Sequence, residues 1–239
     1  MQSYSKPVKM NLKKFLCDFS DLIFPRCCEA CDCPLVGNEA TICTSCIISL
    51  PRIHLHGLHQ DVIRYKFVNI PEVALTHSFL LFTKKGKVQR LLHALKYKGN
   101  NEVGLLLGLM FGQEMLAAGM LPQAGLIISV PLHTKKKKLR SYNQSDLLAE
   151  GFSQATGIPW SATVLERTKH TATQTGKSKM ESRENVKGVF AVKEHIDHKS
   201  VIIIDDVLTT GATLEECVQT LKSAGCKSFT ILTIALAEH

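Results

Sequence analysis

Two adjacent carboxylates and a run of threonines follow an apolar stretch in VIIIDDVLTTGAT, residues 201–213. Asp205 and Asp206 repel each other, which is costly unless a cation or several hydroxyl donors contact them. A sugar diol bound together with Mg²⁺ would provide both kinds of contact. The pair therefore indicates a site for a sugar and a divalent cation, and the alternative is a buried strand capped by two solvated aspartates.

The residues after the carboxylates have the composition of a phosphate-binding loop. In TLEECVQTLKSAG the apolar residues Leu214, Val218 and Leu221 recur at helical spacing, and the closing glycine is typical of a helix C-terminus. A loop that enters a helix N-terminus offers unpaired backbone N–H groups, threonine hydroxyls and the positive end of the helix dipole to a phosphate. The predicted loop residues are Thr209, Thr210, Gly211, Ala212 and Thr213. Sugar, metal and phosphate together describe a ribose 5-phosphate.

The spacing of the clustered cysteines is that of a metal site. Six of the nine cysteines lie within residues 27–46, where two C-x2-C pairs are separated by eleven residues. Such pairs can place four thiolates tetrahedrally around Zn²⁺, and because no position is left for water, the predicted zinc is structural. The predicted ligands are Cys28, Cys31, Cys43 and Cys46. Cys27 and Cys33 stay open as alternatives in another register, whereas the histidines of RIHLHGLHQ are interpreted as part of a linker.

The segments around these motifs have the pattern of a parallel sheet covered by helices. The four residues before Asp205 are apolar without alternation, which is typical of a strand buried on both faces. Further strands are predicted at 72–82, 126–130 and 229–237, and helices at 87–99 and 102–119. In such a sheet the ligand binds at the carboxyl ends of the strands. The segment after 126–130 carries four lysines and Arg140, which either face an anionic ligand or form a solvated run.

Composition limits the partners and the location. The formal charge of +8 and the pI near 9.0 indicate an anionic partner, either a polyanionic small molecule or a nucleic acid. No uninterrupted apolar run reaches the roughly 18 to 20 residues that cross a bilayer, so no transmembrane segment is predicted. Apolar residues recur every three or four positions before Pro25, which favours an amphipathic helix over a secretion signal. Clustered thiols without such a signal favour a cytoplasmic protein.

VIIIDDVLTTGAT resembles the phosphoribosyl-pyrophosphate (PRPP) motif of type I phosphoribosyltransferases. With its cysteine pairs, the chain as a whole resembles the ComF family, which joins such a domain to an N-terminal zinc ribbon. The resemblance implies a type I phosphoribosyltransferase fold, an α/β fold with a mostly parallel sheet flanked by helices, preceded by the small ribbon. The expected divisions are an amphipathic helix at 1–25, the ribbon at 26–50, a linker at 51–71 and the phosphoribosyltransferase-like domain at 72–239.

The resemblance assigns roles to the residues of the motif. Asp205 and Asp206 would hold the ribose hydroxyls and help to position Mg²⁺, and the threonine loop would hold the 5-phosphate. Cations would face the pyrophosphate, because its developing charge must be stabilised as it leaves. The implied catalytic residues are Asp205, Asp206 and Arg140.

The resemblance also assigns roles outside the motif. Arg140, Asn143 and Gln144 match the R-x-x-N-Q element of a pyrophosphate loop, to which Lys137 also belongs. Lys96, in an H-x-L-K-Y stretch, is a further candidate for contact with PRPP. The hydrophilic residues 166–192 resemble the hood loop that closes over PRPP and excludes water. The hood-loop residues that match are Arg167, Gln174, Arg183 and Asn185.

The implied function is binding of PRPP with Mg²⁺ in a protein that supports DNA uptake and natural competence. Transfer of the phosphoribosyl group would proceed by displacement of pyrophosphate at C1, and no residue stands out as a general base. Two other functions stay open. One is an accessory protein that binds single-stranded DNA and proteins of the competence machinery, and the other is a PRPP sensor without transferase turnover.

Overall fold

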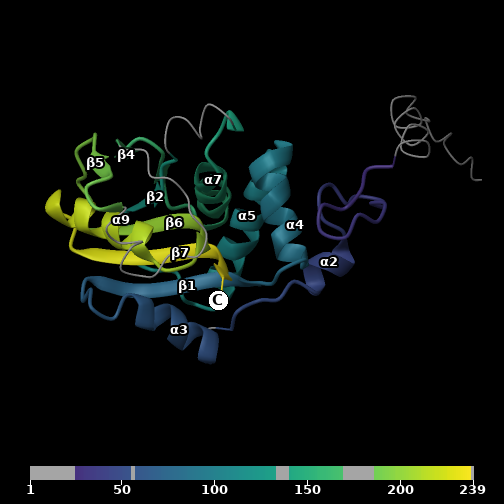
Figure 1. Ribbon diagram of the computed structural model, residues 1–239, viewed down its shortest axis with the longest axis horizontal. Helices are drawn as coiled ribbons and strands as arrows, with labels where there is room; N and C mark the ends of the chain where they lie inside the picture. Colours follow the sequence, from purple (N-terminus) through teal and green to yellow (C-terminus); the bar gives the residue numbers. More distant parts are fainter. Residues whose placement is uncertain (1–24, 55–56, 133–139, 169–185, 238–239) are drawn as a thin grey trace, which may run out of the picture.

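The computed structural model describes residues 25–54, 57–132, 140–168 and 186–237. Its centre is a five-stranded sheet with the strand order β1-β7-β6-β2-β3 (Figure 1). Every pairing in this sheet is parallel, as the apolar strands predict. The strands are β1 (Val73–Phe82), β2 (Leu126–Ser129), β3 (Trp160–Ser161), β6 (Ser200–Leu208) and β7 (Ser228–Ala237).

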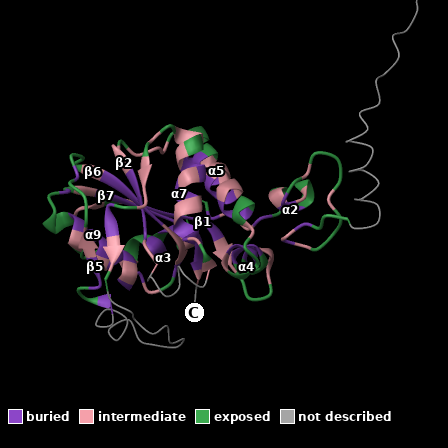
Figure 2. Ribbon diagram, turned by 90° about the horizontal axis from the view of Figure 1, so that it is seen from above, coloured by how far each residue is buried: buried purple, intermediate pink, exposed green. Residues whose placement is uncertain are grey.

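Helices cover both faces of the sheet, and its strands are mostly buried between them (Figure 2). One face is covered by α4 (Lys87–His93), the π-helix η1 (Ala94–Lys98), α5 (Asn101–Ala117) and α7 (Gln144–Thr156). The other face is covered by α3 (Leu58–Lys66) and α9 (Ala212–Ser223). In β6, Ile202 packs into the first layer and Ile203 into the second, which explains why this strand is apolar without alternation.

Helices α5 and α7 cross so closely that their backbones touch. A Cβ atom at Gly108 would lie 2.2 Å from the carbonyl oxygen of Leu148, and one at Gly151 would lie 2.1 Å from that of Leu105. Only glycine permits this approach, because any side chain would force the helices apart. The crossing fixes the N-terminus of α7 beside the carboxyl end of β6.

Residues 26–50, here called the cysteine module, lie beside α4 at one end of the molecule (Figure 1). A bridge between Cys27 and Pro34 closes a loop with the first C-x2-C pair, and the second pair begins at α2 (Thr44–Ile48). Ala30 and Ile42 of the module are buried in the same apolar cluster as α4 and α5. The module is therefore packed against the helical layer.

The segment 51–71, predicted as a linker, contains helix α3. Its chain before the helix also pairs with β1, since the N–H of Ile53 donates to the carbonyl of Phe79 at 3.0 Å. The helix was missed because it buries only Gln60 and Ile63 among its nine residues, too few for a recognisable period. The predicted helix before Pro25 lies outside the described residues. None of the helices in the described ranges has the length and apolarity of a membrane span.

Strand β6 is longer than the sequence predicts. The expected strand ends before the two aspartates, but β6 continues through them to Leu208. The cause is β7, whose ten residues keep pairing with β6, so that Asp205 lies opposite Thr233 and Leu208 opposite Leu236. The aspartates are thus held by backbone pairing on one side, while β2 has already ended on the other.

A buried histidine joins α3 to the sheet. His77 on β1 is 2% exposed, and its Nδ1 donates to Oε1 of Gln60 at 2.9 Å. The Gln60 amide donates in turn to the carbonyl of Thr76 at 2.5 Å. Burial lowers the pKa of His77 from 6.5 to about 4.

This lowered pKa predicts a loss of stability in acid. In the unfolded chain His77 takes up a proton near pH 6.5, whereas in the folded chain it stays neutral until about pH 4. The free energy of unfolding therefore falls as pH falls through this window. His77→Asn keeps an amide donor for Gln60 but cannot titrate. Between pH 8 and pH 4.5 we expect the wild type to lose on the order of 2 kcal/mol more free energy of unfolding than this variant. Urea unfolding at both pH values measures this difference, and equal losses would contradict the buried neutral histidine.

Candidate functional site

The two carboxylates of β6 form the centre of the site. Oδ1 of Asp205 accepts hydrogen bonds from Oγ of Ser145 at 3.0 Å and from the N–H of Asp206 at 2.8 Å. Burial, and then the neighbouring charge of Asp206, raises the pKa of Asp205 to about 7. Asp206 forms an ion pair with Lys96, whose side chain is 23% exposed. The site therefore holds two close carboxylates, and the ammonium group of Lys96 already offsets the charge of one of them.

Lys96 reaches the carboxylates from the π-helix η1. This helix type is rare and occurs mostly as single turns at functional sites. It ends at Gly99, whose φ of 70° lies in the left-handed region that favours glycine. Tyr142 donates a hydrogen bond from its hydroxyl to the carbonyl of Leu95 and so attaches η1 to the start of α7.

The threonine loop lies directly after the carboxylates, between β6 and α9. Gly211 is the N-cap of α9, with φ of 86°, so the loop turns into a helix N-terminus as the sequence predicts. A small cavity of about 30 Å³ is lined by Asp205 and by residues 207–214. Phe67 lies behind the loop, because a Cβ at Gly211 would be 3.3 Å from its ring. Phe67 directly follows α3, and sequence reasoning missed its place here because the whole segment was interpreted as a linker.

The R-x-x-N-Q residues lie at the start of α7, after β2. Nη1 of Arg140 donates to Oε1 of Gln144 at 2.6 Å, and its guanidinium lies 5.2 Å from the ring centroid of Tyr97. Nδ2 of Asn143 donates to the carbonyl of Val130 at 3.0 Å. Asn143 and Gln144 are 4% and 1% exposed. Their buried side chains therefore attach the start of α7 to Val130 and hold the guanidinium of Arg140, which is itself partly exposed.

Two neighbouring polar residues complete the start of α7. Ser145 bonds to Asp205, as described, and Oδ1 of Asp146 accepts from Oγ of Ser129 at 2.6 Å and from Nδ2 of Asn143 at 2.7 Å. Sequence reasoning missed both residues. The only available signal was their position directly after the R-x-x-N-Q match.

The hood loop is described at its two ends. Arg167 lies on β4 (Leu165–Arg167), which pairs antiparallel with β5 (Phe190–Val192), and its guanidinium is 5.5 Å from the ring centroid of Phe190. The predicted site residues Lys137, Gln174, Arg183 and Asn185 lie outside the described residues.

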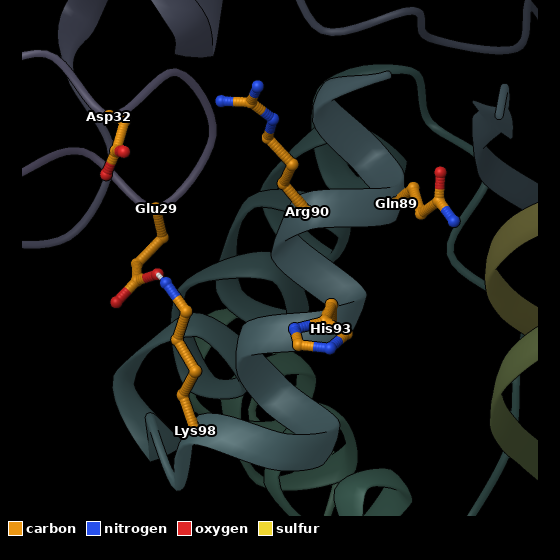
Figure 3. Close-up of a pocket in the computed structure, with 6 residues that line it drawn as sticks. All are labelled: Glu29, Asp32, Gln89, Arg90, His93 and Lys98. Carbon is orange, nitrogen blue, oxygen red and sulfur yellow. Dashed lines mark hydrogen bonds and ion pairs between the residues drawn. The ribbon is translucent and has the colours of Figure 1, made fainter. Parts of the chain in front are cut away.

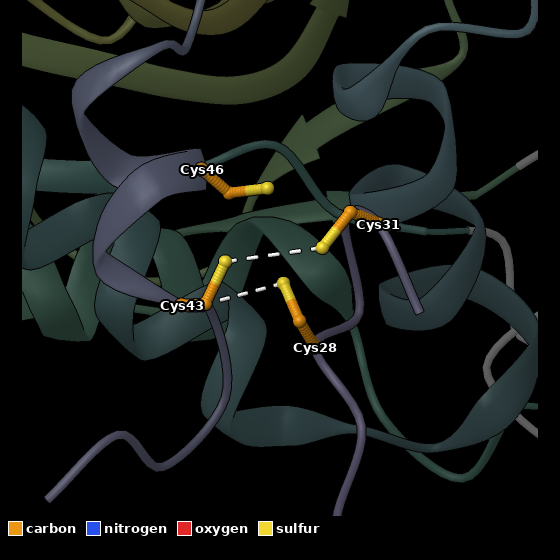
Figure 4. A group of neighbouring side chains, drawn as sticks. All are labelled: Cys28, Cys31, Cys43 and Cys46. Atoms are coloured by element: carbon orange, nitrogen blue, oxygen red, sulfur yellow. Dashed lines mark hydrogen bonds between the residues drawn. The ribbon is translucent and has the colours of Figure 1, made fainter. Parts of the chain in front are cut away.

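The four predicted cysteine ligands converge in the cysteine module (Figure 4). Their sulfur atoms all lie within 4.8 Å of one another, and the sulfurs of Cys31 and Cys43 are 3.8 Å apart. Four sulfurs arranged tetrahedrally at about 2.3 Å from a metal ion would be separated by about 3.8 Å. The cluster therefore has the dimensions of a four-thiolate metal site. Cys27 and Cys33 are exposed and outside it, and the described part of the chain contains no second cluster of this kind.

Hydrogen bonds prepare one of these thiols for ionisation. Burial raises the pKa of Cys28, but backbone N–H groups, first that of Cys43 at 3.3 Å, outweigh burial and lower this pKa to about 7. Burial raises the pKa of Cys46. A cation among the sulfurs would favour the thiolate at every position.

Comparison with known proteins places this arrangement in a family. Residues 145–239 match the family described as "Phosphoribosyl transferase domain". Competence protein F of Haemophilus influenzae is 38% identical over 120 residues, which cover 49% of this chain and 52% of that protein. DNA utilization protein YhgH of Escherichia coli (strain K12) is 32% identical over 206 residues, which cover 83% of this chain and 85% of that protein. The chain belongs to the ComF family.

Membership in the ComF family confirms the predicted fold, a type I phosphoribosyltransferase fold with a mostly parallel sheet flanked by helices. The match to YhgH of Salmonella typhi, 34% identical, spans 61% of that relative, so two of the ComF relatives are matched over little more than half their length. A PRPP amidotransferase from B. subtilis aligns with 54% of this chain and 25% of its own, at 22% identity and a TM-score of 0.37.

Proposed function

We propose that this ComF protein binds PRPP together with Mg²⁺ at the carboxyl end of β6, in the cytoplasm. The observation that carries the proposal is that two carboxylates, Lys96 and the threonine loop before α9 all lie at the same end of β6. Asp205 and Asp206 suit the ribose hydroxyls and the divalent cation. The ion pair with Lys96 supports this role, because it shows that Asp206 accepts a cation from the open side of the strand.

The remaining contacts follow from the chemistry of PRPP. The loop at 209–213 offers hydroxyls and the helix N-terminus to the 5-phosphate. Arg140, fixed by Gln144 and lying over the Tyr97 ring, suits the pyrophosphate. In a transfer, an acceptor nucleophile would bond to C1 as the C1–O bond breaks. Pyrophosphate would leave with the electron pair of that bond, and Arg140 and Lys96 would stabilise its charge. Such a site lowers the barrier by positioning and electrostatics, with Mg²⁺ offsetting part of the pyrophosphate charge.

We assign structural zinc to the cysteine cluster as part of the same proposal. Thiolates favour zinc over magnesium, and four of them leave no position for a substrate or water. The module buries few side chains of its own, so the metal would supply much of its stability.

Single-stranded DNA binding in support of DNA uptake is the second candidate function. The names of the relatives, competence protein F and DNA utilization protein, suggest it. So does the surface around η1, where the 66% exposed Tyr97 lies between His93 at 4.9 Å and Arg140 at 5.2 Å. Aromatic rings among cations bind single strands by stacking and by phosphate contact. Proteins of the competence machinery are the partners that this function would require.

Titration of the protein with PRPP and Mg²⁺ by calorimetry tests the first function. We expect binding that requires Mg²⁺ and that Lys96→Ala weakens roughly 10- to 100-fold, as for loss of a charged hydrogen bond. Lys222→Ala is the matched control, because this lysine pairs with Glu72 at the opposite end of α9 and should not affect affinity. No binding of PRPP to the wild type would contradict the proposal. An assay for released pyrophosphate with candidate acceptors then separates a transferase from a sensor.

A labelled single-stranded oligonucleotide, titrated in parallel, tests the second function. If the two ligands share cations, saturating PRPP should displace the oligonucleotide. The logarithm of DNA affinity should fall linearly with the logarithm of salt concentration, with a slope of about 0.7 for each phosphate contact. A protein without affinity for the oligonucleotide at low salt would rule out direct DNA binding.

A further inference from the structure

A glutamate inside the first C-x2-C pair contacts the end of the π-helix. Glu29 lies between Cys28 and Cys31 in sequence, and its Oε2 is 2.9 Å from Nζ of Lys98. Its Oε1 accepts from Nδ2 of Asn100 at 3.1 Å. The two contacts lie on either side of Gly99, the residue at which η1 ends. One carboxylate of the cysteine module therefore fixes both sides of this turn.

Apolar packing of Cys28 and Ala30 also holds the module against α4 and η1, and Glu29 adds the polar contacts at this end. Figure 3 shows that the ends of Glu29 and Lys98 meet, and that Arg90 and His93 project from the neighbouring helix α4. A cavity of about 310 Å³ is lined by Glu29, Asp32, Gln89, Arg90, His93 and Lys98. Because side chains do not fill this cavity, no packing of side chains within it could replace the contacts of Glu29. The Glu29 side chain is 18% exposed and that of Lys98 is 56% exposed, so the carboxylate is largely shielded from water and the ammonium is not.

The same short helix carries Lys96. η1 has five residues, and a π-helical turn of this length is not stable by itself. Its conformation must come from its contacts. Ala94 and Leu95 are buried, and Tyr142 donates to the carbonyl of Leu95. Two ion pairs add to these contacts, Lys96 with Asp206 on the side of the ligand site and Lys98 with Glu29 on the side of the module. Only Tyr97 separates these lysines, so a shift at Lys98 moves Lys96.

We propose that Glu29 is a positioning residue, which acts through Lys98, Asn100 and η1 to hold Lys96 at the PRPP site. The inference rests on the proposed function, since it concerns the affinity of the same site. It gives the cysteine module a second role, because a change in the metal-binding loop that moves Glu29 also alters PRPP binding. The module thereby couples the state of its thiols to the phosphoribosyl site.

Two variants from opposite sides of the contact test the coupling. Glu29→Gln and Lys98→Gln are both expected to weaken PRPP binding in the presence of Mg²⁺, roughly tenfold, a typical coupling between sites. Both should also speed hydrogen exchange of the backbone amides in residues 94–98, a readout that does not need PRPP. Glu114→Gln is the matched control, because Glu114 pairs with Arg52 at 2.9 Å on α5, away from η1, and should change neither result.

A double-mutant cycle shows whether Glu29 acts through Lys96. In a Lys96→Ala background, Glu29→Gln should cause no further loss of PRPP affinity, whereas an equal loss in both backgrounds would overturn the proposal. Unchanged affinity and exchange in both single variants would also overturn it. If Glu29→Gln loses zinc or does not fold, Lys98→Gln decides, since it lies outside the module. If the wild type does not bind PRPP, the proposed function fails, and the exchange rates alone still show whether Glu29 holds η1.

Discussion

Asp205→Asn combined with Asp206→Asn is expected to abolish PRPP binding while the chain still melts cooperatively. The two carboxylates are the proposed contacts of the ribose hydroxyls and of Mg²⁺, and neutral amides cannot offset the charge of the cation. Loss of two charged contacts should weaken affinity by at least roughly 100-fold. The fold should tolerate the change, because burial and mutual repulsion already raise the pKa of Asp205 to about 7. An asparagine at 205 can also still accept the bond from Ser145.

Calorimetry with PRPP and Mg²⁺, and a thermal melt of the same sample, measure the two parts of this expectation. Asp197→Asn is the control, because Asp197 is an exposed carboxylate, 86% accessible, whose partner is His195. Wild-type affinity in the double variant would end the assignment of the ribose site. Loss of cooperative melting would instead show that the pair supports the fold.

Cys43→Ser is expected to release zinc and to unfold the cysteine module. The wild type should contain one zinc ion per chain, and a serine hydroxyl is a poor replacement for the thiolate of a four-sulfur site. The apparent binding energy of such sites in small zinc-binding peptides is about 10 to 16 kcal/mol, so the metal dominates the stability of a module of this size. The sheet domain should remain folded at a lower melting temperature, because Cys28, Ala30 and Cys46 pack into its helical layer.

Elemental analysis of freshly purified protein gives the zinc content, and circular dichroism follows the two folding units. Cys33→Ser is a close control, since this exposed cysteine lies outside the cluster and should leave the zinc content unchanged. Full zinc content in Cys43→Ser, or none in the wild type, would refute the four-cysteine site.

Local patterns were sufficient to predict four strands of the sheet and the main groups of the candidate site, but not the two-residue strand β3. Helices cover both faces of strand β6, so its residues are apolar without alternation, and this pattern is visible in the sequence. The cysteine pairs are equally local, since both ligands of a pair belong to one turn of chain. The threonine loop follows Asp206 in sequence, so backbone continuity alone places it at the same end of the strand.

Contacts between distant parts of the chain could not be predicted in this way. Helix α3 depends on the bond between Gln60 and His77 and on burial against β1, and neither leaves a repeating pattern. Glu29 is 69 residues from Lys98, and no spacing relates them. The R-x-x-N-Q match locates Arg140 and Asn143 at the carboxyl end of the strands. A motif does not show, however, that the asparagine side chain is buried.

The chain between the cysteine module and α3 has a further effect on the outer strand of the sheet. β1 pairs with β7 on one side, and on the other the N–H of Leu81 donates to the carbonyl of Pro51 at 2.8 Å, beside an antiparallel bridge between Arg52 and Leu80. An uncovered outer strand is a template for association with another chain. A truncated protein that begins after Ile53 would expose this edge and aggregate, whereas one that begins at Leu50 would keep it covered. The module's exit segment thus also protects the sheet against intermolecular pairing.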